Sequence, residues 1–398
     1  MEKLEVIGAK KLKGTVKISG SKNSSLPILA ATLLTNKKVK IFNLPDVKDI
    51  ETMILLLRSL GSKVKFYKKY KSVDIYNSTN IKTFASYSLV KTMRAGILVL
   101  GPLLARFKKA KVSLPGGCAI GARPVDIHLK ALSRLGVNYK IIEGYIYASA
   151  PKGLIGNTIK FSKISVGATE NLIIAASLAK GKTILKNCAI EPEIVDLINF
   201  LRKMGCDIKW KGKRTIAING VKSLKKIQYK IMFDRIEAGS YMIASALTEG
   251  NLRIINIKPK IIQTEIDILK KIGASIKTTD TELRIIGKKK IKNIKITTSP
   301  YPGFPTDLQA QLMVLLCRSY GRSEIIEKIF ENRFMHASEL NRMGAKIKIS
   351  GNKAIIQGNV VFKSAELMAT DLRASVSLIL AALSAKGKSI INRIYHLD

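Results

Sequence analysis

The sequence predicts a mixed α/β fold of two lobes, built from six copies of one βαβαββ-type unit, with three copies in each lobe. The first observation behind this prediction is a helix-ending motif, Leu-x-x-Leu/Met/Ile-Gly, followed each time by a strand-like segment. Glycine ends helices in this way because it adopts a positive φ without strain. The motif recurs about every 70 residues, which indicates an internal repeat. Its glycines are Gly61, Gly136, Gly205, Gly273 and Gly344.

Six apolar segments rich in small residues are the second observation. Because they are apolar nearly all round, they predict buried helices, one near the start of each unit. They span residues 26–34, 96–105, 171–179, 238–247, 309–317 and 373–383. Since only five closing glycines accompany these six helices, we expect the chain to stop inside its sixth unit, so that the last unit is incomplete.

Segments with alternating or lysine-rich faces lie between the helices. They predict strands that are buried on one face of a sheet and exposed on the other. The segments are residues 64–75, 145–148, 215–218, 282–286 and 353–356.

Six units of similar size favour two lobes with a ligand cleft between them. The chain is expected to cross between the lobes in segments 14–25 and 228–238. The expected bounds are 1–21 plus 234–398 for lobe one, which carries Asp307, Arg333 and Arg373, and 22–233 for lobe two, which carries the loop around Cys118.

Composition narrows the class of protein. The chain has 398 residues, 46% of them hydrophobic, which is enough to bury sizeable cores. An uncharged apolar run of about 18 residues is absent, as is the apolar segment of a signal peptide, so we expect a cytoplasmic protein with no membrane association. The cysteines Cys118, Cys188, Cys206 and Cys317 are scattered. This spacing argues against a zinc site or a disulfide framework and predicts a reducing compartment.

The formal net charge of +41 is the most unusual feature of the composition. One interpretation is nucleic-acid binding through neutralisation of phosphates. The lysines are, however, spread along the whole chain, often at the ends of expected strands and helices, and the sequence holds no arginine-rich arm. We therefore expect small-molecule substrates and do not expect nucleic acid as a partner, despite the charge.

Segment 113–128 differs from the other connections in the chain. It holds three glycines and two prolines together with Cys118, Arg123 and Asp126. Its Pro-Gly-Gly run does not continue a helix or a strand comfortably, so the cysteine lies on specially shaped backbone. Two interpretations stay open on these residues alone. The thiol is either a reactive group whose thiolate Arg123 stabilises, or a small buried residue in a tight turn.

Cationic residues stand at the N-termini of several expected helices. Such a terminus binds anions, and guanidinium groups grip carboxylate and phosphate through paired hydrogen bonds. At each position the alternative is an ordinary capping segment or a solvated side chain. The residues are Lys22, Arg94, Lys163 and Arg373 at helix starts, with Arg123 and Arg333 on loops. Together they predict an anionic small-molecule substrate.

Two further polar clusters flank the fifth apolar helix. Asp307, in Pro-Gly-Phe-Pro-Thr-Asp, is either the N-cap of that helix or a carboxylate held in a cleft as a base. The segment Glu-Asn-Arg-Phe-Met-His at 331–336 is unusually charged and aromatic for a connection. Its His336 is, on its own, more often a structural residue than a catalytic one. Walker, Rossmann and kinase motifs are absent from the sequence.

These motifs, in their order along the chain, resemble those of the enolpyruvyl transferase family and, within it, of the UDP-N-acetylglucosamine 1-carboxyvinyltransferases. The loop Leu114-Pro-Gly-Gly-Cys-Ala-Ile-Gly-Ala-Arg-Pro-Val-Asp126 is the most specific match. The resemblance implies a two-lobed inside-out α/β barrel that continues after the position of Asp398 with an arginine that reaches the active site. The related shikimate-pathway enzymes share the six-unit fold but not the loop. The other matching segments are 18–23, 92–94, 165–169, 304–307, 331–336 and 371–375.

The resemblance implies a reaction. The enolpyruvyl group of phosphoenolpyruvate is transferred to the 3′-hydroxyl of UDP-N-acetylglucosamine through a tetrahedral ketal, with release of phosphate, as the first committed step of peptidoglycan synthesis. Cys118 matches the family's general acid, which also forms an adduct with phosphoenolpyruvate and is alkylated by fosfomycin. Asp307 matches the carboxylate proposed to take the hydroxyl proton. The resemblance implies no metal or organic cofactor.

Binding residues follow from the same resemblance. The positions implied for phosphoenolpyruvate are Lys22, Asn23, Arg94, Arg123, Arg333 and Arg373. Those implied for UDP-N-acetylglucosamine are Asn23, Arg94, Arg123, Pro124, Val125, Asp126, Ile127, Lys163, Ser165, Val166, Asp307 and Ile329. The alternatives are the shikimate-pathway 3-phosphoshikimate 1-carboxyvinyltransferase and, from a different class, a basic nucleic-acid-binding protein.

Overall fold

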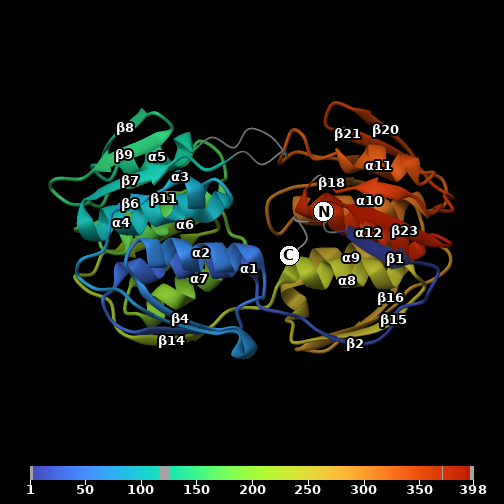
Figure 1. Cartoon of the computed structure of the whole chain (residues 1–398), viewed down its shortest axis with the longest axis horizontal. Coiled ribbons are helices and arrows are strands. Elements are labelled where there is room, and N and C mark those ends of the chain that lie inside the picture. The colour runs from blue at the N-terminus through green and yellow to red at the C-terminus, as the bar shows by residue number, and fades with distance from the viewer. Residues whose placement is uncertain (1–2, 117–124, 370, 395–398) are drawn as a thin grey trace. The chain divides into compact units, whose positions relative to one another are not determined.

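The computed structural model describes residues 3–116, 125–369 and 371–394, and the chain forms two compact units (Figure 1). The chain leaves unit 1 after Ser19 and returns to it after Met232. Of the described residues, unit 1 holds 3–19, 233–369 and 371–394, and unit 2 holds 20–116 and 125–232. The strands described in each unit form three small sheets.

The repeat is seen most simply in one sheet of unit 2, whose strand order is β10-β11-β13-β12. Helix α6 connects the parallel strands β10 and β11, because parallel neighbours need a crossover. Helix α7 then leads to the hairpin β12–β13, and β13 pairs antiparallel with β11. This is the predicted βαβαββ unit. The bounds are β10 (Thr158–Lys160), α6 (Val166–Ala176), β11 (Lys182–Lys186), α7 (Pro192–Lys203), β12 (Asp207–Gly212) and β13 (Thr215–Asn219).

The other two sheets of unit 2 repeat this order as β14-β3-β5-β4 and β6-β7-β9-β8. In the first of them, the parallel edge strand β14 comes from the end of the unit. The strands are β3 (Val39–Phe42), β4 (Lys63–Tyr67), β5 (Ser72–Tyr76), β6 (Phe84–Ala85), β7 (Lys109–Ser113), β8 (Asn138–Ile142), β9 (Tyr145–Ser149) and β14 (Ile227–Lys230). The helices are α1 (Lys22–Ala31), η1 (Thr32–Leu34), α2 (Lys48–Ser59), η2 (Lys68–Tyr70), α3 (Tyr87–Val90), η3 (Arg94–Val99), α4 (Leu100–Phe107) and α5 (Asp126–Ser133).

Unit 1 contains the sheets β16-β17-β15-β2, β18-β19-β21-β20 and β1-β23-β22. Among the described residues, the last of these has three strands, and β1 pairs antiparallel with β23. The strands are β1 (Lys3–Ile7), β2 (Lys13–Lys17), β15 (Asn251–Ile255), β16 (Ser275–Thr278), β17 (Glu282–Ile286), β18 (Lys295–Thr297), β19 (Arg322–Ile326), β20 (Lys346–Ser350), β21 (Lys353–Gln357), β22 (Glu366–Met368) and β23 (Lys388–Asn392). The helices are α8 (Arg235–Leu247), η4 (Pro259–Ile262), α9 (Gln263–Lys271), η5 (Thr306–Leu308), α10 (Gln309–Cys317), α11 (His336–Arg342) and α12 (Leu372–Ser384).

The glycines of the repeat end their helices as predicted. The φ values of Gly61, Gly136, Gly205, Gly273 and Gly344 are 100°, 91°, 106°, 117° and 96°, all in the region that glycine favours. One strand prediction is wrong. Segment 64–75 forms two strands, β4 and β5, joined by η2. The alternating pattern hid the turn, because paired strands of a hairpin place their apolar residues on the same face.

The predicted apolar helices form the core of each unit. Nearly every residue of α1 and α6 in unit 2, and of α10 in unit 1, is buried. The strands turn alternate residues toward them, so that Val39 and Ile41 of β3 are buried while Lys40 between them is half-buried. Helices inside and sheets outside give the inside-out arrangement expected from the sequence. Within the ranges described, none of these helices is both long and apolar enough to cross a bilayer.

Candidate active site

Asp307 of unit 1 is held by two arginines that are distant in sequence. It lies in η5, directly before α10. Its Oδ1 accepts a hydrogen bond from Nη2 of Arg333 at 3.0 Å, and its Oδ2 accepts one from Nη2 of Arg373 at 2.9 Å. Both carboxylate oxygens therefore accept hydrogen bonds from guanidinium groups and not from helix N–H groups. The N-cap interpretation of Asp307 is wrong.

The three side chains form a largely buried charge cluster. The side chain of Arg333 is 5% exposed, that of Arg373 16% and that of Asp307 25%. Burial alone would raise the pKa of Asp307. The charges of Arg373 and Arg333, the hydrogen bond from Arg373 and the charge of Arg235 outweigh burial and hold that pKa well below its ordinary value. Asp307 is therefore a weak base while both arginines bind it.

Local capping fixes the start of the helix that carries Arg373. Asp371 is the N-cap of α12, and its Oδ1 accepts hydrogen bonds from the backbone N–H groups of Arg373 at 2.9 Å and Ala374 at 3.1 Å. Arg333 comes from the loop before α11, where its guanidinium carbon lies 5.2 Å from the ring centre of Phe330. Capping thus fixes the backbone from which the Arg373 side chain extends, and stacking on Phe330 orients the guanidinium group of Arg333.

Arg235 is a candidate that the sequence reasoning missed. It is the first residue of α8 and is 7% exposed. Its Nη1 lies 3.9 Å from Oε1 of the buried Glu265, and its guanidinium carbon lies 5.9 Å from the ring centre of Tyr301. A cation at the start of an apolar helix was the signal used for the other candidates, and it applies equally to Arg235.

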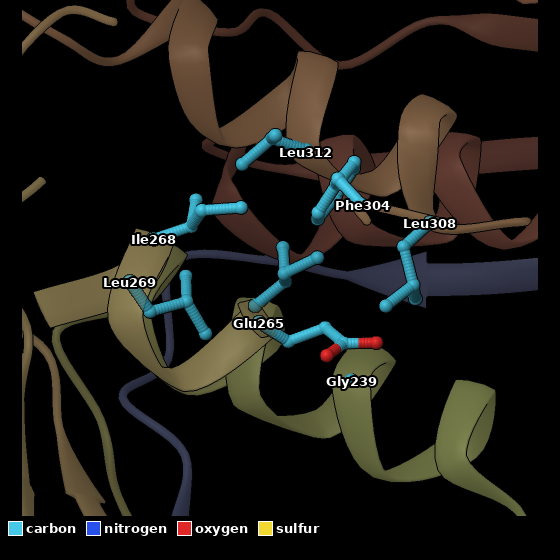
Figure 2. A pocket seen from close by; sticks show the side chains of 8 residues that line it. Gly239, Glu265, Ile268, Leu269, Phe304, Leu308 and Leu312 are labelled. Atoms are coloured by element: carbon cyan, nitrogen blue, oxygen red, sulfur yellow. The ribbon is translucent and has the colours of Figure 1, made fainter. Parts of the chain in front are cut away.

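A small, mainly apolar pocket adjoins the Asp307 loop (Figure 2). Leu308, which follows Asp307, lines it together with Phe304 of the same loop. On the α8 side, Gly239 permits a very close approach, because a Cβ there would lie 2.3 Å from Cδ1 of Leu308. The other lining residues are Ile243, Glu265, Ile268, Leu269 and Leu312.

Replacing Gly239 with alanine is therefore expected to displace Leu308 and, with it, Asp307. We expect kcat to fall about tenfold or more and the free energy of unfolding to fall by about 1–3 kcal/mol, the usual range for overpacking. Steady-state kinetics and urea unfolding test this, with Tyr241→Phe, at an exposed position of the same helix, as the control. In an open helix position alanine would be favoured over glycine by about 1 kcal/mol, so a stabilised, fully active variant would contradict this account.

In unit 2, Lys22 is the first residue of α1. Its Nζ lies 2.8 Å from Oδ2 of Asp49. Ser21 is the N-cap, since its Oγ accepts a hydrogen bond from the N–H of Ser24 at 3.2 Å. The capping alternative is thus confirmed for Ser21, and it leaves Lys22 and the partly exposed Asn23 in the first turn of the helix.

Arg94 begins η3, and a buried polar network holds its neighbours. Asn171 of α6 accepts a hydrogen bond from the N–H of Gly101 at 2.8 Å and donates one to the carbonyl of Ile97 at 3.2 Å. Its Nδ2 also lies 3.2 Å from Nδ1 of His128. One amide therefore ties α6 to η3, α4 and α5, the elements that carry or flank several predicted site residues.

Two of the positions predicted to contact the nucleotide sugar lie at the start of α6. Ser165 is its N-cap and accepts a hydrogen bond from the N–H of Ala168 at 3.3 Å, as the capping alternative held. Val166 is 37% exposed. By contrast, Val125 and Ile127 are buried in the core, so any contact they make with a ligand would be through backbone atoms.

Asp126 and Lys163 interact electrostatically. Burial acts to raise the pKa of Asp126, but the hydrogen bond from Lys130, a backbone N–H and the charges of Lys130 and Lys163 lower it overall. Nζ of Lys130 lies 3.2 Å from Oδ2 of Asp126.

Cys118, Arg123 and Pro124 lie outside the described residues. The described segment before them ends at Gly116, where a Cβ would lie 2.1 Å from the carbonyl oxygen of Lys91, so the approach to the loop requires glycine.

In unit 1, Ile329 is 36% exposed. Within residues 3–116, 125–369 and 371–394, no group of three or more His, Cys, Asp or Glu side chains could hold a metal ion.

The two described histidines are buried and neutral. Burial lowers the pKa of His128 to about 4, with the charge of Arg94 acting in the same direction and that of Asp126 opposing it. Burial also lowers the pKa of His336 to about 4, opposed by Asp371 and assisted by Arg333. Both values lie below the ordinary 6.5.

Stability is therefore expected to fall as the pH falls from about 6.5 to about 4, because the unfolded chain binds protons in this window that the folded chain does not. The expected loss is roughly 3 kcal/mol per histidine. Urea unfolding at pH 7 and pH 4.5 measures it. His128→Gln and His336→Gln should each remove one share of the pH dependence, and variants that kept the full dependence would show that other groups cause it.

The chain is similar to known proteins over nearly its whole length. The family model of EPSP synthase (3-phosphoshikimate 1-carboxyvinyltransferase) matches residues 6–398. The chain is 73% identical to the UDP-N-acetylglucosamine 1-carboxyvinyltransferase of Pelagibacter ubique (strain HTCC1062), over 100% of this chain and 95% of that protein. It is 53% identical to the protein of the same name from Helicobacter pylori (strain HPAG1), over 100% of this chain and 94% of the relative.

Solved structures agree on the fold. The enolpyruvyl transferase NikO from Streptomyces tendae matches with a TM-score of 0.90 and 24% identity, over 99% of this chain and 93% of that one. EPSP synthase from Acinetobacter baumannii matches with a TM-score of 0.74 and 18% identity, over 99% and 95% of the two chains. Near-complete coverage in all these comparisons, together with the six repeated sheets, shows that this chain belongs to the enolpyruvyl transferase family and, within it, to the UDP-N-acetylglucosamine 1-carboxyvinyltransferases.

Proposed function

We propose that this protein transfers the enolpyruvyl group of phosphoenolpyruvate to the 3′-hydroxyl of UDP-N-acetylglucosamine and releases phosphate, the first committed step of peptidoglycan synthesis. The observation that carries the proposal is its 73% identity, over its whole length, to an enzyme with that name. In this reaction a proton adds to the methylene carbon of phosphoenolpyruvate while the hydroxyl oxygen adds to the neighbouring carbon. Loss of phosphate and of a methyl proton from the resulting ketal then restores the double bond.

Asp307 is the proposed base for the 3′-hydroxyl proton. Its two ion pairs with Arg333 and Arg373 hold its pKa too low for this role at neutral pH. An incoming anion that binds the same guanidinium groups would draw them from the carboxylate and raise its pKa. We therefore propose that phosphoenolpyruvate binding to Arg333 and Arg373 prepares Asp307 as a base.

The other residues inferred from the sequence supply the remaining roles in this proposal. Lys22, Asn23, Arg94 and Arg123 bind the phosphate and carboxylate of phosphoenolpyruvate, and Cys118 delivers the proton to its methylene carbon. The positions proposed for UDP-N-acetylglucosamine are those inferred from the sequence. The side chains of Val125 and Ile127 are buried, so their role is assigned to the backbone. We place the reaction in the cytoplasm, where the buried free thiols Cys188, Cys206 and Cys317 stay reduced.

The shikimate-pathway alternative has less support. The similar EPSP synthase structures are only 18% identical, whereas relatives named for the UDP-N-acetylglucosamine reaction reach 73% and 53%. No contact in the described parts of the two units favours nucleic-acid binding over this reaction.

Phosphate release from the purified full-length protein tests the proposal. We expect release only when phosphoenolpyruvate and UDP-N-acetylglucosamine are both present, with a product heavier than UDP-N-acetylglucosamine by one enolpyruvyl group. Release with shikimate 3-phosphate in place of the nucleotide sugar would favour the alternative. Failure to release phosphate with either acceptor would contradict the proposed activity.

A further inference from the structure

Glu327 joins the loop that carries Asp307 to the turn that carries Ile329. It is 2% exposed and follows directly after β19. We propose that Glu327 is a positioning residue. It fixes the position of the base, Asp307, relative to Ile329, the residue proposed to contact the nucleotide sugar. This role rests on the proposed function, because it concerns the alignment of the same two substrates.

One carboxylate oxygen of Glu327 binds the Asp307 loop. Its Oε2 accepts a hydrogen bond from Oγ1 of Thr306 at 2.8 Å. Thr306 directly precedes Asp307 in η5, a single turn of 3-10 helix. This hydrogen bond is a tether on the residue next to the base. It therefore limits how far Asp307 can move when Arg333 and Arg373 release it.

The other oxygen binds the opposite turn. Its Oε1 accepts hydrogen bonds from the N–H of Ile329 at 2.7 Å and the N–H of Phe330 at 3.2 Å, and from Oγ1 of Thr298 at 2.8 Å. Oγ1 of Thr298 in turn accepts a hydrogen bond from the N–H of Lys328 at 3.0 Å. Three consecutive backbone N–H groups, 328–330, are thus directed at this one side chain and its threonine partner.

The same turn leads to the arginine that binds Asp307. Arg333 lies three residues after Phe330, and its guanidinium group lies over the Phe330 ring at 5.2 Å. Glu327 therefore supports the base through Thr306 and the partner of the base through the 329–330 turn. A carboxylate suits this position because it only accepts hydrogen bonds, and all four of its partners here are donors.

This arrangement matters for transfer because the hydroxyl proton must lie within hydrogen-bond reach of the base, and a displacement of about 1 Å can cost on the order of 100-fold in rate. The Thr306 hydroxyl, by contrast, binds Glu327 and not the arginines proposed for phosphoenolpyruvate. Loss of the tether should therefore affect kcat and the KM for UDP-N-acetylglucosamine far more than the KM for phosphoenolpyruvate.

The test uses Thr306→Val, which removes one hydroxyl while keeping the shape of the side chain, and Thr306→Ser, which keeps the hydroxyl. For Thr306→Val we expect kcat to fall about tenfold or more and the KM for UDP-N-acetylglucosamine to rise, with Thr306→Ser recovering most of the loss. Glu327→Gln, which places an amide N–H₂ among donors, should lose on the order of 100-fold. Isothermal calorimetry with UDP-N-acetylglucosamine gives a second readout that needs no turnover.

Thr35→Val is the matched control. Thr35 of unit 2 is 3% exposed, and its hydroxyl donates a hydrogen bond to the carbonyl of Leu224 at 3.0 Å and accepts one from the N–H of Lys37 at 3.1 Å. Thr35→Val should lose at least as much thermal stability as Thr306→Val while keeping its kinetics. Wild-type kinetics and sugar affinity in both Thr306→Val and Glu327→Gln would overturn the positioning role and leave the proposed function standing. Wild-type protein that released no phosphate would overturn both.

Discussion

Replacing Asp307 with asparagine is expected to lower kcat by roughly 10²- to 10⁴-fold, the usual contribution of a positioned acid or base. The amide has nearly the same shape, so the loop should stay in place through Thr306 while the proton acceptor is lost. Phosphate-release kinetics at saturating substrates measure the effect. Glu324→Gln is the matched control, because Glu324 of strand β19 also pairs with cations in unit 1, namely Lys295 and Lys353 at 3.5 Å each.

The same substitution should also lower stability. It leaves Arg333, 5% exposed, and Arg373, 16% exposed, without their shared counter-charge. Removing one member of such a buried cluster costs about 3 kcal/mol or more. Millimolar phosphate should therefore raise the Tm of Asp307→Asn more than that of the wild type, because the two guanidinium groups then bind the anion. Equal phosphate effects on the two proteins would show that this cluster is not the anion site.

The pH dependence of stability gives an independent check on the cluster. The folded pKa of Asp307 lies below the ordinary 3.8, so its stabilising contribution is present above that pH and is lost as the pH falls further. Asp307→Asn should therefore lack the part of acid destabilisation that the wild type shows below about pH 4. The histidine-dependent loss between about pH 6.5 and 4 should remain in the variant.

The fold could be predicted from the sequence because its signals are local and repeated. Each closing glycine, such as Gly205, sits at a helix end where backbone geometry demands it, and the apolar helices need no partner to be recognised. The strand prediction failed where the alternating pattern of two neighbouring strands ran on through the turn between them. The segment 64–75 alternates through a hairpin, and the turn η2 at Lys68–Tyr70 carries no glycine or proline to mark it.

The site was predictable only in part, because its geometry depends on contacts between distant segments. Asp307 and Arg373 are 66 residues apart, and the sequence near Asp307, taken alone, favours a helix cap. Glu327 carries no motif of its own, and its role becomes visible only when Thr306 and Ile329 are seen to share its carboxylate. Arg235 could have been found by applying the helix-start criterion to every apolar helix.

Replacing Cys118 with alanine is expected to lower kcat by roughly 10²- to 10⁴-fold, because the proposed proton donor is removed. It should also remove the reactive thiol. Burial raises the pKa of Cys188 to about 12, of Cys206 to about 11 and of Cys317 to about 12, so these thiols hold almost no thiolate at neutral pH. Intact-mass measurement after iodoacetamide should show one label on the wild type and none on Cys118→Ala. Cys317→Ala, the control, should take up one label and stay active.

Serine at position 118 separates the two interpretations that the loop sequence left open. If Cys118 were only a small residue filling a tight turn, Cys118→Ser would keep nearly full activity, because the hydroxyl is close to the thiol in size. A general acid must instead have a pKa near the working pH, and a serine hydroxyl is a far weaker acid than a thiol. We therefore expect Cys118→Ser to be almost as inactive as Cys118→Ala while both keep the Tm of the wild type. A serine variant with wild-type kcat would leave the proton to another donor.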